Sequence, residues 1–249
     1  MKKILLSIAV MSISAMSMAQ DATVESILDT YFENTGGRDA WNALEGYKMT
    51  AGVSMQGMDI PLEIYSMKDG RAITTFSVMG MDLAQDAFDG EVAWGTNFQS
   101  MSAEKSDSEQ TENVKRESKD YPDPFLNYEE NGYSVELMEN ENVDGIDCFV
   151  LKLTKGTTLV DEEEMENISY FYFDTENYVP VQIKQEMLSG EMAGEMSVTT
   201  FSDYQEVDGL YFPFSITQGL EDGEGQTVEI TEVELNPEVE DSLFAFPGE

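Results

Sequence analysis

The alternation of apolar and polar residues over residues 47–98 restricts the possible folds of this chain more than any other feature. In its first segment every second side chain is apolar, namely Tyr47, Met49, Ala51, Val53 and Met55. A period of two gives a half-buried antiparallel strand one apolar and one polar face. Asp69-Gly70 and Asp89-Gly90 separate later segments, and Asp-Gly favours tight hairpins because its residues tolerate positive φ. The stretch therefore predicts a meander of four or five strands.

The same alternation returns after Tyr133 and continues almost to the end of the sequence. Strand-like segments cover residues 149–153, 170–173, 179–187, 210–217 and 228–235, with Asp-Gly turns at 144–145, 208–209 and 222–223. A change of phase before Val233 predicts a β-bulge. In total we expect about ten to twelve strands, a number that curls into a barrel or half-barrel. The predicted fold class is mainly β: a single curved, half-open antiparallel barrel.

Two parts of the sequence predict a cover for this sheet. Residues 21–35 carry an apolar stripe with helical spacing, formed by Val24, Ile27, Leu28, Tyr31 and Phe32. A short second helical stretch follows Asp39. Residues 99–132 form a polar insertion, whose part 99–120 fits either a mobile connection or a solvated helix and whose part 121–132 fits a short amphipathic turn. We expect the N-terminal helix and this insertion to form a lid.

Residues 1–19 have the features of a secretory signal peptide. Lys2 and Lys3 precede an apolar run that ends in Ser17-Met18-Ala19, where small residues suit cleavage after Ala19. We therefore expect one mature domain, residues 20–249, located in the periplasm or secreted. No other apolar run approaches the ~20 residues of a membrane-spanning helix, so we expect no transmembrane segment.

The charge is strongly negative. Fifty acidic residues face thirteen basic ones, which gives a formal net charge of −37. Such a surface repels nucleic acids and anionic lipid headgroups, so we exclude a nucleic-acid partner. We interpret the acidity as solubilising, and adaptation to salt stays open.

The residue types present leave little room for catalysis. The sequence has no histidine, which excludes Ser-His-Asp and Cys-His catalysis and the usual histidine-based zinc sites. Cys148 is the single cysteine and is interpreted as a small core residue. No pair of carboxylates stands out among fifty, and residues 221–225 lack the ligand spacing of a calcium loop. We expect no catalytic residue, no metal and no cofactor; a secreted enzyme of unrecognised type remains the least favoured hypothesis.

Six segments, in this order, point to a known group of proteins. They are TGGRDAW (35–41), FDGEVAW (88–94), NGYSVELMENENVDG (131–145), YFYFDTENYVPVQI (170–183), FSDYQEVDGLYFPFSI (201–216) and LNPEVEDSLFAFP (235–247). With these the chain resembles the LolA/LolB/LppX-like superfamily, and more specifically the outer-membrane lipoprotein-sorting proteins of Bacteroidota. The resemblance implies an open curved sheet with a helical lid over an apolar cavity that takes acyl chains. It also implies a basic residue that holds the lid, for which Lys68 and Arg71 are the candidates.

The resulting prediction is a periplasmic carrier that binds lipid or lipoprotein acyl chains, as a monomer, with residues 99–128 controlling access. The alternative is an envelope sensor or protein-interaction module whose cavity is filled by its own side chains. Twelve of the sixteen methionines follow residue 19, and they fit either ordinary core filling or a pliable cavity wall. The predicted ligand-binding wall consists of Met49, Val53, Met55, Leu62, Ile64, Phe76, Phe149, Leu151, Phe171, Phe173, Phe212 and Phe214.

Overall fold

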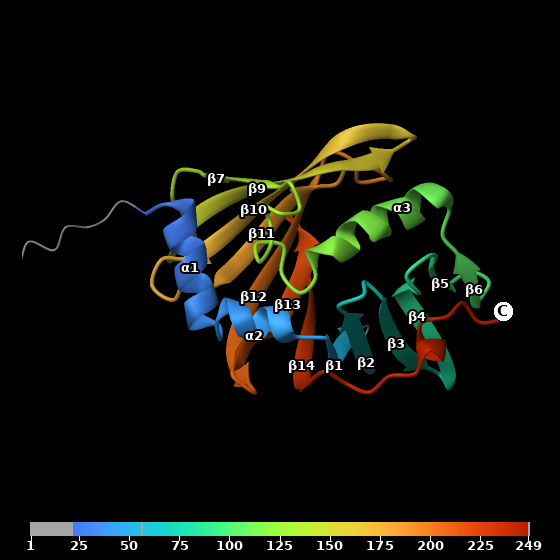
Figure 1. Cartoon of the computed structure of the whole chain (residues 1–249). Coiled ribbons are helices and arrows are strands. Elements are labelled where there is room, and N and C mark those ends of the chain that lie inside the picture. Colours follow the sequence, from blue (N-terminus) through green and yellow to red (C-terminus); the bar gives the residue numbers. More distant parts are fainter. Residues whose placement is uncertain (1–21, 56, 249) are drawn as a thin grey trace, which may run out of the picture.

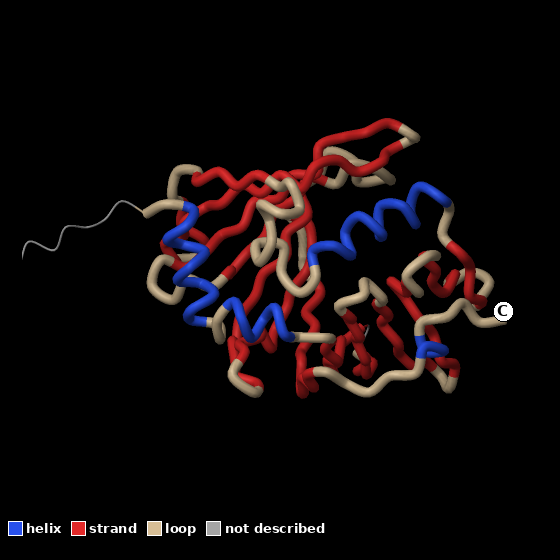
Figure 2. The backbone as a smooth tube through the Cα atoms, in the orientation of Figure 1, coloured by secondary structure: helices blue, strands red, loops and turns tan. Residues whose placement is uncertain are grey.

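The computed structural model describes residues 22–55 and 57–248 (Figures 1 and 2). The predicted signal peptide, residues 1–19, lies outside the described residues. Within the described part of the chain, no helix combines the length and the apolar character needed to cross a membrane.

Among residues 22–55 and 57–248, one antiparallel sheet of fourteen strands dominates the fold (Figure 2). Its path runs from β6 at one edge through β5-β4-β3-β2-β1-β14-β13-β12-β11-β10-β9 to β7, and β8 pairs with β9. Because β6 and β7 do not pair with each other, the sheet stays open, and the predicted mainly β, half-open architecture is confirmed. The strands are β1 Gly46–Met55, β2 Met58–Met67, β3 Ala72–Val78, β4 Met81–Phe88, β5 Ala93–Asn97, β6 Ser102–Lys105, β7 Ser134–Leu137, β8 Glu141–Val143, β9 Ile146–Val160, β10 Glu163–Asp174, β11 Pro180–Glu186, β12 Met196–Val207, β13 Leu210–Leu220 and β14 Gln226–Leu235.

The strand count exceeds the prediction because β6, β7 and β8 are too short to show a clear alternation. Two Asp-Gly turns have positive φ at both residues, as the hairpin signal predicts: Asp144-Gly145 at 50° and 94°, and Asp208-Gly209 at 50° and 89°. The predicted bulge is also present. The register between β1 and β14 shifts at Thr50/Ala51, and the Thr231 hydroxyl donates a hydrogen bond to the Thr50 carbonyl at 3.1 Å.

In the described part of the chain, three α-helices accompany the sheet: α1 Val24–Asn34, α2 Arg38–Ala43 and α3 Ser108–Glu117. Two short 3-10 turns, η1 Ser118–Asp120 and η2 Asp241–Leu243, complete the described elements. Thr23 and Ser26 cap the start of α1 reciprocally, at 3.2 and 2.9 Å, which satisfies amide groups that the first turn leaves open. The predicted helix over residues 21–35 is therefore confirmed. Of the two alternatives for residues 99–120, a mobile connection or a solvated helix, α3 corresponds to the solvated helix.

Apolar side chains are buried on both faces of the sheet. On the concave face, α1, α2 and residues 121–128 pack over the centre and one side of the sheet (Figure 1). On the convex face of β2–β5, the C-terminal segment packs against Trp94, whose indole N–H donates to the Phe244 carbonyl at 2.8 Å. Cys148 is completely buried on the convex face beside Val150 and Tyr172, and burial raises the pKa of its thiol to about 11. The thiol is thus a core group, as predicted.

Candidate binding site

The register of the sheet brings the two halves of the predicted wall onto one concave face. Val53 of β1 pairs with Val228 of β14, and Val228 pairs with Ile216 of β13. On the far side, Phe171 pairs with Leu151. Since residues paired across a ladder share a face and side chains alternate along each strand, all twelve predicted wall residues lie on this face.

The twelve residues differ in how far they are covered. Six are buried in the concave core: Met49, Leu151, Phe171, Phe173, Phe212 and Phe214. Leu62, Ile64 and Phe149 are half-buried against that core, and Val53 is buried. Phe76 is half-buried with its ring centre 6.3 Å from that of Phe98, whereas Met55 is 45% exposed at the end of β1. Their role in ligand binding stays a prediction.

Beneath α1 the concave face is filled by the protein itself. Phe125 is fully buried, with its ring centre 4.7 Å from that of Phe171 and 5.7 Å from that of Phe173. Asp123 fixes this segment by accepting hydrogen bonds from the Tyr31 hydroxyl at 2.7 Å and from the Phe125 amide at 2.8 Å. Burial raises the pKa of the Asp123 carboxyl to about 6. Residues 121–128 are therefore part of the core.

The helix α3 is attached in a different way. It lies on the open side of the sheet, between β5 and the hairpin formed by β9 and β10 (Figure 1), and none of its side chains is buried. Arg116 donates two hydrogen bonds to Glu164, at 2.7 and 3.0 Å, and one to the Thr157 carbonyl at 3.1 Å. This guanidinium lowers the pKa of the Glu164 carboxyl to about 2. The Asn113 side chain bonds the Leu159 amide and carbonyl, both at 2.8 Å.

Of the two predicted lid-holding residues, Lys68 contacts the end of α2 and Arg71 contacts the C-terminal segment. Lys68 donates to the Asn42 carbonyl at the end of α2, at 3.0 Å, and to Glu45 at 2.7 Å. Arg71 pairs with Asp69 and, at 2.7 Å, with Asp241 of the C-terminal segment. Both lie in the β2–β3 turn and its flank, at the opposite edge of the sheet from the β9–β10 hairpin.

The residue that holds α3 is Arg116, which the sequence-based prediction missed. One arginine in a polar stretch carries no spacing signal for a contact made 48 positions away. The available local signal was the pair Glu112 and Arg116, four residues apart on one helix face and 3.4 Å apart in the structure. That pair predicts a solvated helix but not its partner on the sheet.

An ion pair between Lys155 and Asp120 joins η1 to the sheet next to α3. Lys155 of β9 and Asp120 pair at 2.6 Å, with side chains only 15% and 16% exposed. The Tyr133 hydroxyl also donates to Asp120, at 2.8 Å. Removing one partner would leave a poorly solvated charge, so this ion pair anchors the C-terminal end of α3. The remaining length of the helix is held by polar contacts that are exposed or half-buried.

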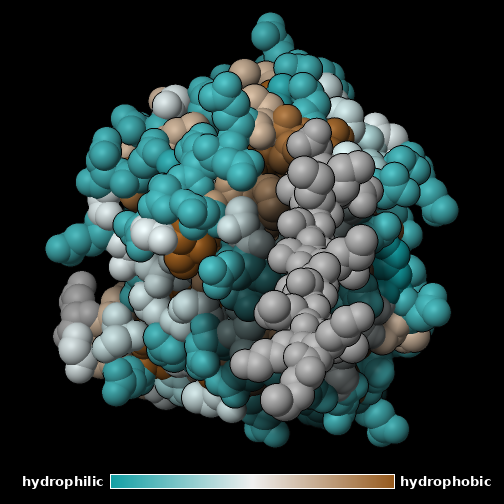
Figure 3. All heavy atoms as spheres, turned by 90° about the vertical axis from the view of Figure 1, so that its left-hand side faces the viewer, coloured by the Kyte–Doolittle hydropathy of each residue, from teal (hydrophilic) through white to brown (hydrophobic). Residues whose placement is uncertain are grey.

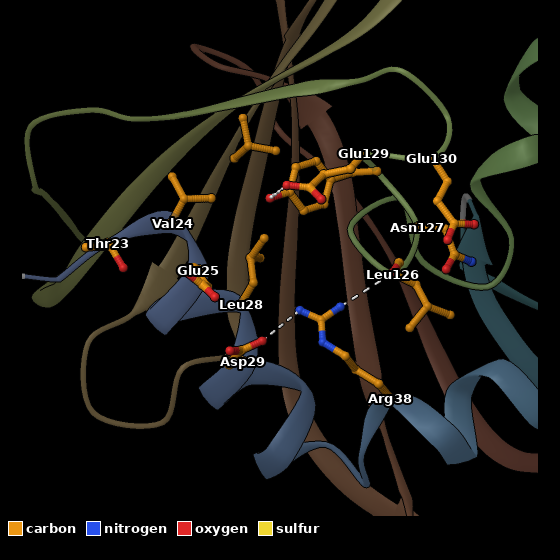
Figure 4. Close-up of a pocket in the computed structure, with 12 residues that line it drawn as sticks. Thr23, Val24, Glu25, Leu28, Asp29, Arg38, Leu126, Asn127, Glu129 and Glu130 are labelled. Carbon is orange, nitrogen blue, oxygen red and sulfur yellow. Dashed lines mark hydrogen bonds and ion pairs between the residues drawn. The ribbon is translucent and has the colours of Figure 1, made fainter.

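A pocket of about 630 Å³ opens at the end of the molecule that carries α1 (Figure 4). Arg38 lies across it, 3.1 Å from the Asp29 carboxylate and 3.4 Å from the Leu126 carbonyl, with its guanidinium 4.2 Å from the centre of the Phe32 ring. The surface around this end is mostly hydrophilic (Figure 3). The pocket is lined by Thr23, Val24, Glu25, Leu28, Asp29, Arg38, Leu126, Asn127, Tyr128, Glu129, Glu130 and Val135. Four carboxylates against one guanidinium disfavour an anionic ligand.

A second pocket, of about 250 Å³, lies beside α3. Asn113 and Glu117 of α3 form one wall, and the β9–β10 hairpin and the β11–β12 turn form the others. Asn167, Gln185 and Ser197 line it as well, so this opening is polar. Among the described residues, no group of three or more carboxylate or cysteine side chains is placed to hold a metal ion.

Comparisons with known proteins agree with this architecture. A family model described as "Uncharacterized protein" matches residues 118–246, more than half of the chain. The chain belongs to this family. No curated protein matches the sequence significantly.

Solved structures extend the likeness to nearly the whole chain. A LolA superfamily protein from Nitrosomonas europaea matches with a TM-score of 0.53 and 15% identity, over 90% of this chain and 98% of the other. A DUF1329 family protein from Desulfovibrio piger matches with a TM-score of 0.54 and 15% identity, over 89% of this chain and 97% of the other. A putative outer membrane lipoprotein-sorting protein domain from Vibrio parahaemolyticus has a TM-score of 0.47 and 14% identity, over 88% of this chain and 94% of the other. At these identities the likeness shows the fold alone, and that fold is LolA-like, as the resemblance in the sequence implies.

Proposed function

We propose that this protein is an extracytoplasmic carrier without enzymatic activity, which holds the acyl chains of lipids or lipoproteins between the concave face of the sheet and α3. The proposal involves no covalent step and no cofactor, and it assigns the binding unit to a monomer. The LolA-like fold and the predicted signal peptide support the location outside the cytoplasm.

One observation carries the proposal: the apolar concave face continues beyond the part that the protein fills itself. Leu62, Ile64, Ile216 and Val228 are half-buried and adjoin the concave core, and Phe76 continues the same face. The helix that crosses this side buries none of its own side chains there. Burial of hydrocarbon is worth ~0.8 kcal/mol per methylene, so an acyl chain of ordinary length gains several kcal/mol on this strip.

The contacts that attach α3 to the β9–β10 hairpin suit a helix that moves away from the sheet. Arg116 and Glu164 are 29% and 51% exposed in their side chains, and ion pairs that reach solvent contribute little stability. Releasing them costs far less than withdrawing a buried apolar helix face. We infer that α3 moves away from the β9–β10 hairpin to admit the chain, while the group formed by Lys155 and Asp120 acts as the pivot.

A second function is an envelope sensor or protein-interaction module on the same fold, without bound lipid. The filled space beneath α1 favours it, because Phe125 and Leu126 occupy volume that a ligand would otherwise take. In this case the half-buried strip would be closed by small movements of α3 alone.

Organic-solvent extraction of the purified protein, followed by mass spectrometry, separates the two functions. The carrier predicts a stoichiometric lipid, and the sensor predicts a clean extract and no uptake of a fluorescent fatty acid. Ile216→Trp tests the location, since the larger side chain fills the strip and should abolish uptake. Ser77→Trp is the matched control because Ser77 is exposed on the other face of β3; uptake that is equal in both variants would refute the proposed location.

A further inference from the structure

Three neighbouring hairpins expose large apolar side chains at their turns, along the side of the sheet where these strand ends lie. The pairs β1–β2, β3–β4 and β5–β6 follow each other in the meander, so their turns lie at the same edge. We call the six side chains at these turns the methionine edge: Met55 45% exposed, Met58 47%, Met79 85%, Met81 41%, Phe98 53% and Met101 40%. Single exposed apolar residues are ordinary, but a gathering of this kind marks an interaction site.

Two of these methionines have a backbone conformation that methionine rarely adopts. Met79 and Met101 both have φ of 54°, in the left-handed region that glycine and asparagine adopt readily and bulky side chains disfavour. Turn residues such as Asn or Gly would relieve this conformation. Because Met79 is also the most exposed of the six, its side chain adds little to the packing of the fold. Residues that break a local rule without structural gain are expected at functional sites.

Carboxylates lie beside the methionine edge. Gln226, at the start of β14, donates to the Ser54 carbonyl at 3.1 Å, so the β13–β14 turn is next to the β1–β2 turn. This neighbouring turn carries exposed Asp222 and Glu224, and Glu221 paired with Lys184 at 2.6 Å. Two more carboxylates adjoin the methionine edge, because Asp59 and Asp82 are exposed directly after Met58 and Met81.

We propose that the methionine edge is a docking surface for a basic, amphipathic segment of a partner protein. Flexible, polarizable methionine side chains adapt to varied apolar surfaces, and the adjoining carboxylates complement lysine and arginine. The same carboxylates disfavour an anionic lipid surface. This inference does not rest on lipid binding. The methionine edge adjoins the strip, since Met55 belongs to the predicted wall and Phe98 packs beside Phe76, so the variants of this edge below change only Met79, Met81 and Met101.

Fluorescence anisotropy with a labelled amphipathic helical peptide of leucine and lysine tests the proposal on the whole mature chain. We expect saturable binding that weakens with added salt. The triple variant Met79→Ser, Met81→Ser, Met101→Ser should bind at least about tenfold more weakly. The matched control Met138→Ser, Ile146→Ser removes side chains that are 41% and 39% exposed elsewhere and should bind as the wild type does. Fatty-acid uptake should be the same in both variants.

A second set of measurements identifies the kind of occupant. Replacing the same three methionines by leucine preserves apolar area and should keep the peptide affinity within about threefold. Loss of binding in the leucine variant would overturn the proposal in favour of a ligand specific for thioether sulfur. Equal peptide binding by the serine triple variant and the wild type would overturn it as well, as would cosedimentation with phosphatidylcholine vesicles without any binding of the peptide.

Discussion

Asp123 shows how one residue can couple a segment of the insertion to the N-terminal helix. Its carboxylate receives the Tyr31 hydroxyl from α1 and the amide of Phe125 from its own segment. Both bonds favour the charged form, but burial outweighs them and raises the pKa to about 6. The residue is therefore held by hydrogen bonds and at the same time binds a proton more readily when the chain is folded.

The pH dependence of stability follows from this shift. The folded state binds a proton at Asp123 over the range from the ordinary pKa of 3.8 to about 6, where the unfolded state has lost it. The stabilisation that protonated Asp123 adds to the free energy of unfolding is complete below pH 3.8. It is lost as the pH rises through about 6. Asp123→Asn should remove this part of the dependence.

Thermal unfolding at pH 4 and pH 7 measures the effect. The difference in melting temperature between the two pH values should be smaller in Asp123→Asn than in the wild type. Asp144→Asn, at an exposed turn residue with positive φ, should keep the wild-type difference. Identical differences in all three proteins would show that Asp123 does not titrate as described.

Phe125 makes the packing of the same segment testable. Its side chain is fully buried between two aromatic rings of β10. Phe125→Ala should lower the free energy of unfolding by about 3–5 kcal/mol, as large-to-small changes at buried aromatic residues do. Urea unfolding measures this loss. A cost below about 1 kcal/mol would mean that residues 121–128 are a loose cover rather than part of the core.

At the scale of elements, the molecule has two kinds of cover over its concave face. The helices α1 and α2, together with residues 121–128, bury apolar side chains on the sheet. The helix α3 instead uses Arg116, Asn113 and Glu109, and the last of these accepts hydrogen bonds from the amides of Asp161 and Glu162 at 3.2 and 2.6 Å. Elements held by few buried contacts open with the least free energy.

Replacing Arg116 should therefore loosen α3 alone. Arg116→Ala removes the contacts with Glu164 and Thr157, and we expect faster amide hydrogen exchange in residues 108–117 with a change in global stability below about 1 kcal/mol. Lys115→Ala removes the same charge from an exposed neighbouring position and serves as the control. Unchanged exchange in Arg116→Ala would contradict the assignment of Arg116 as the residue that holds α3.

These elements also show the reach of sequence reasoning. The stripe of Ile27, Leu28, Tyr31 and Phe32 predicts α1 because helix periodicity is a local property. The partner of Arg116 could not be predicted, since it depends on how a hairpin far along the chain curves towards α3. The same limit applies to Lys68 and Arg71: the family resemblance indicates an approximate region of the sequence but not the direction in which each side chain points.

At the scale of the whole molecule, alternation was sufficient to predict one curved, open sheet and to place the predicted wall on a single face. It could not predict how much of that face the protein covers itself. Phe125 and Leu126 lie in the polar insertion, and their burial depends on docking against Phe171 of a strand formed much later in the chain. The concave face is consequently divided into a filled part beneath α1 and a half-buried apolar strip on the side of α3.

Photo-crosslinking with a diazirine-bearing fatty acid tests most directly whether this strip binds hydrocarbon. After irradiation, peptide mass spectrometry locates the labelled residues in the wild-type protein. The account predicts labels concentrated at Leu62, Ile64, Ile216 and Val228, displaced by excess unlabelled fatty acid. Labels confined to the convex face, or labelling that unlabelled fatty acid does not displace, would contradict it.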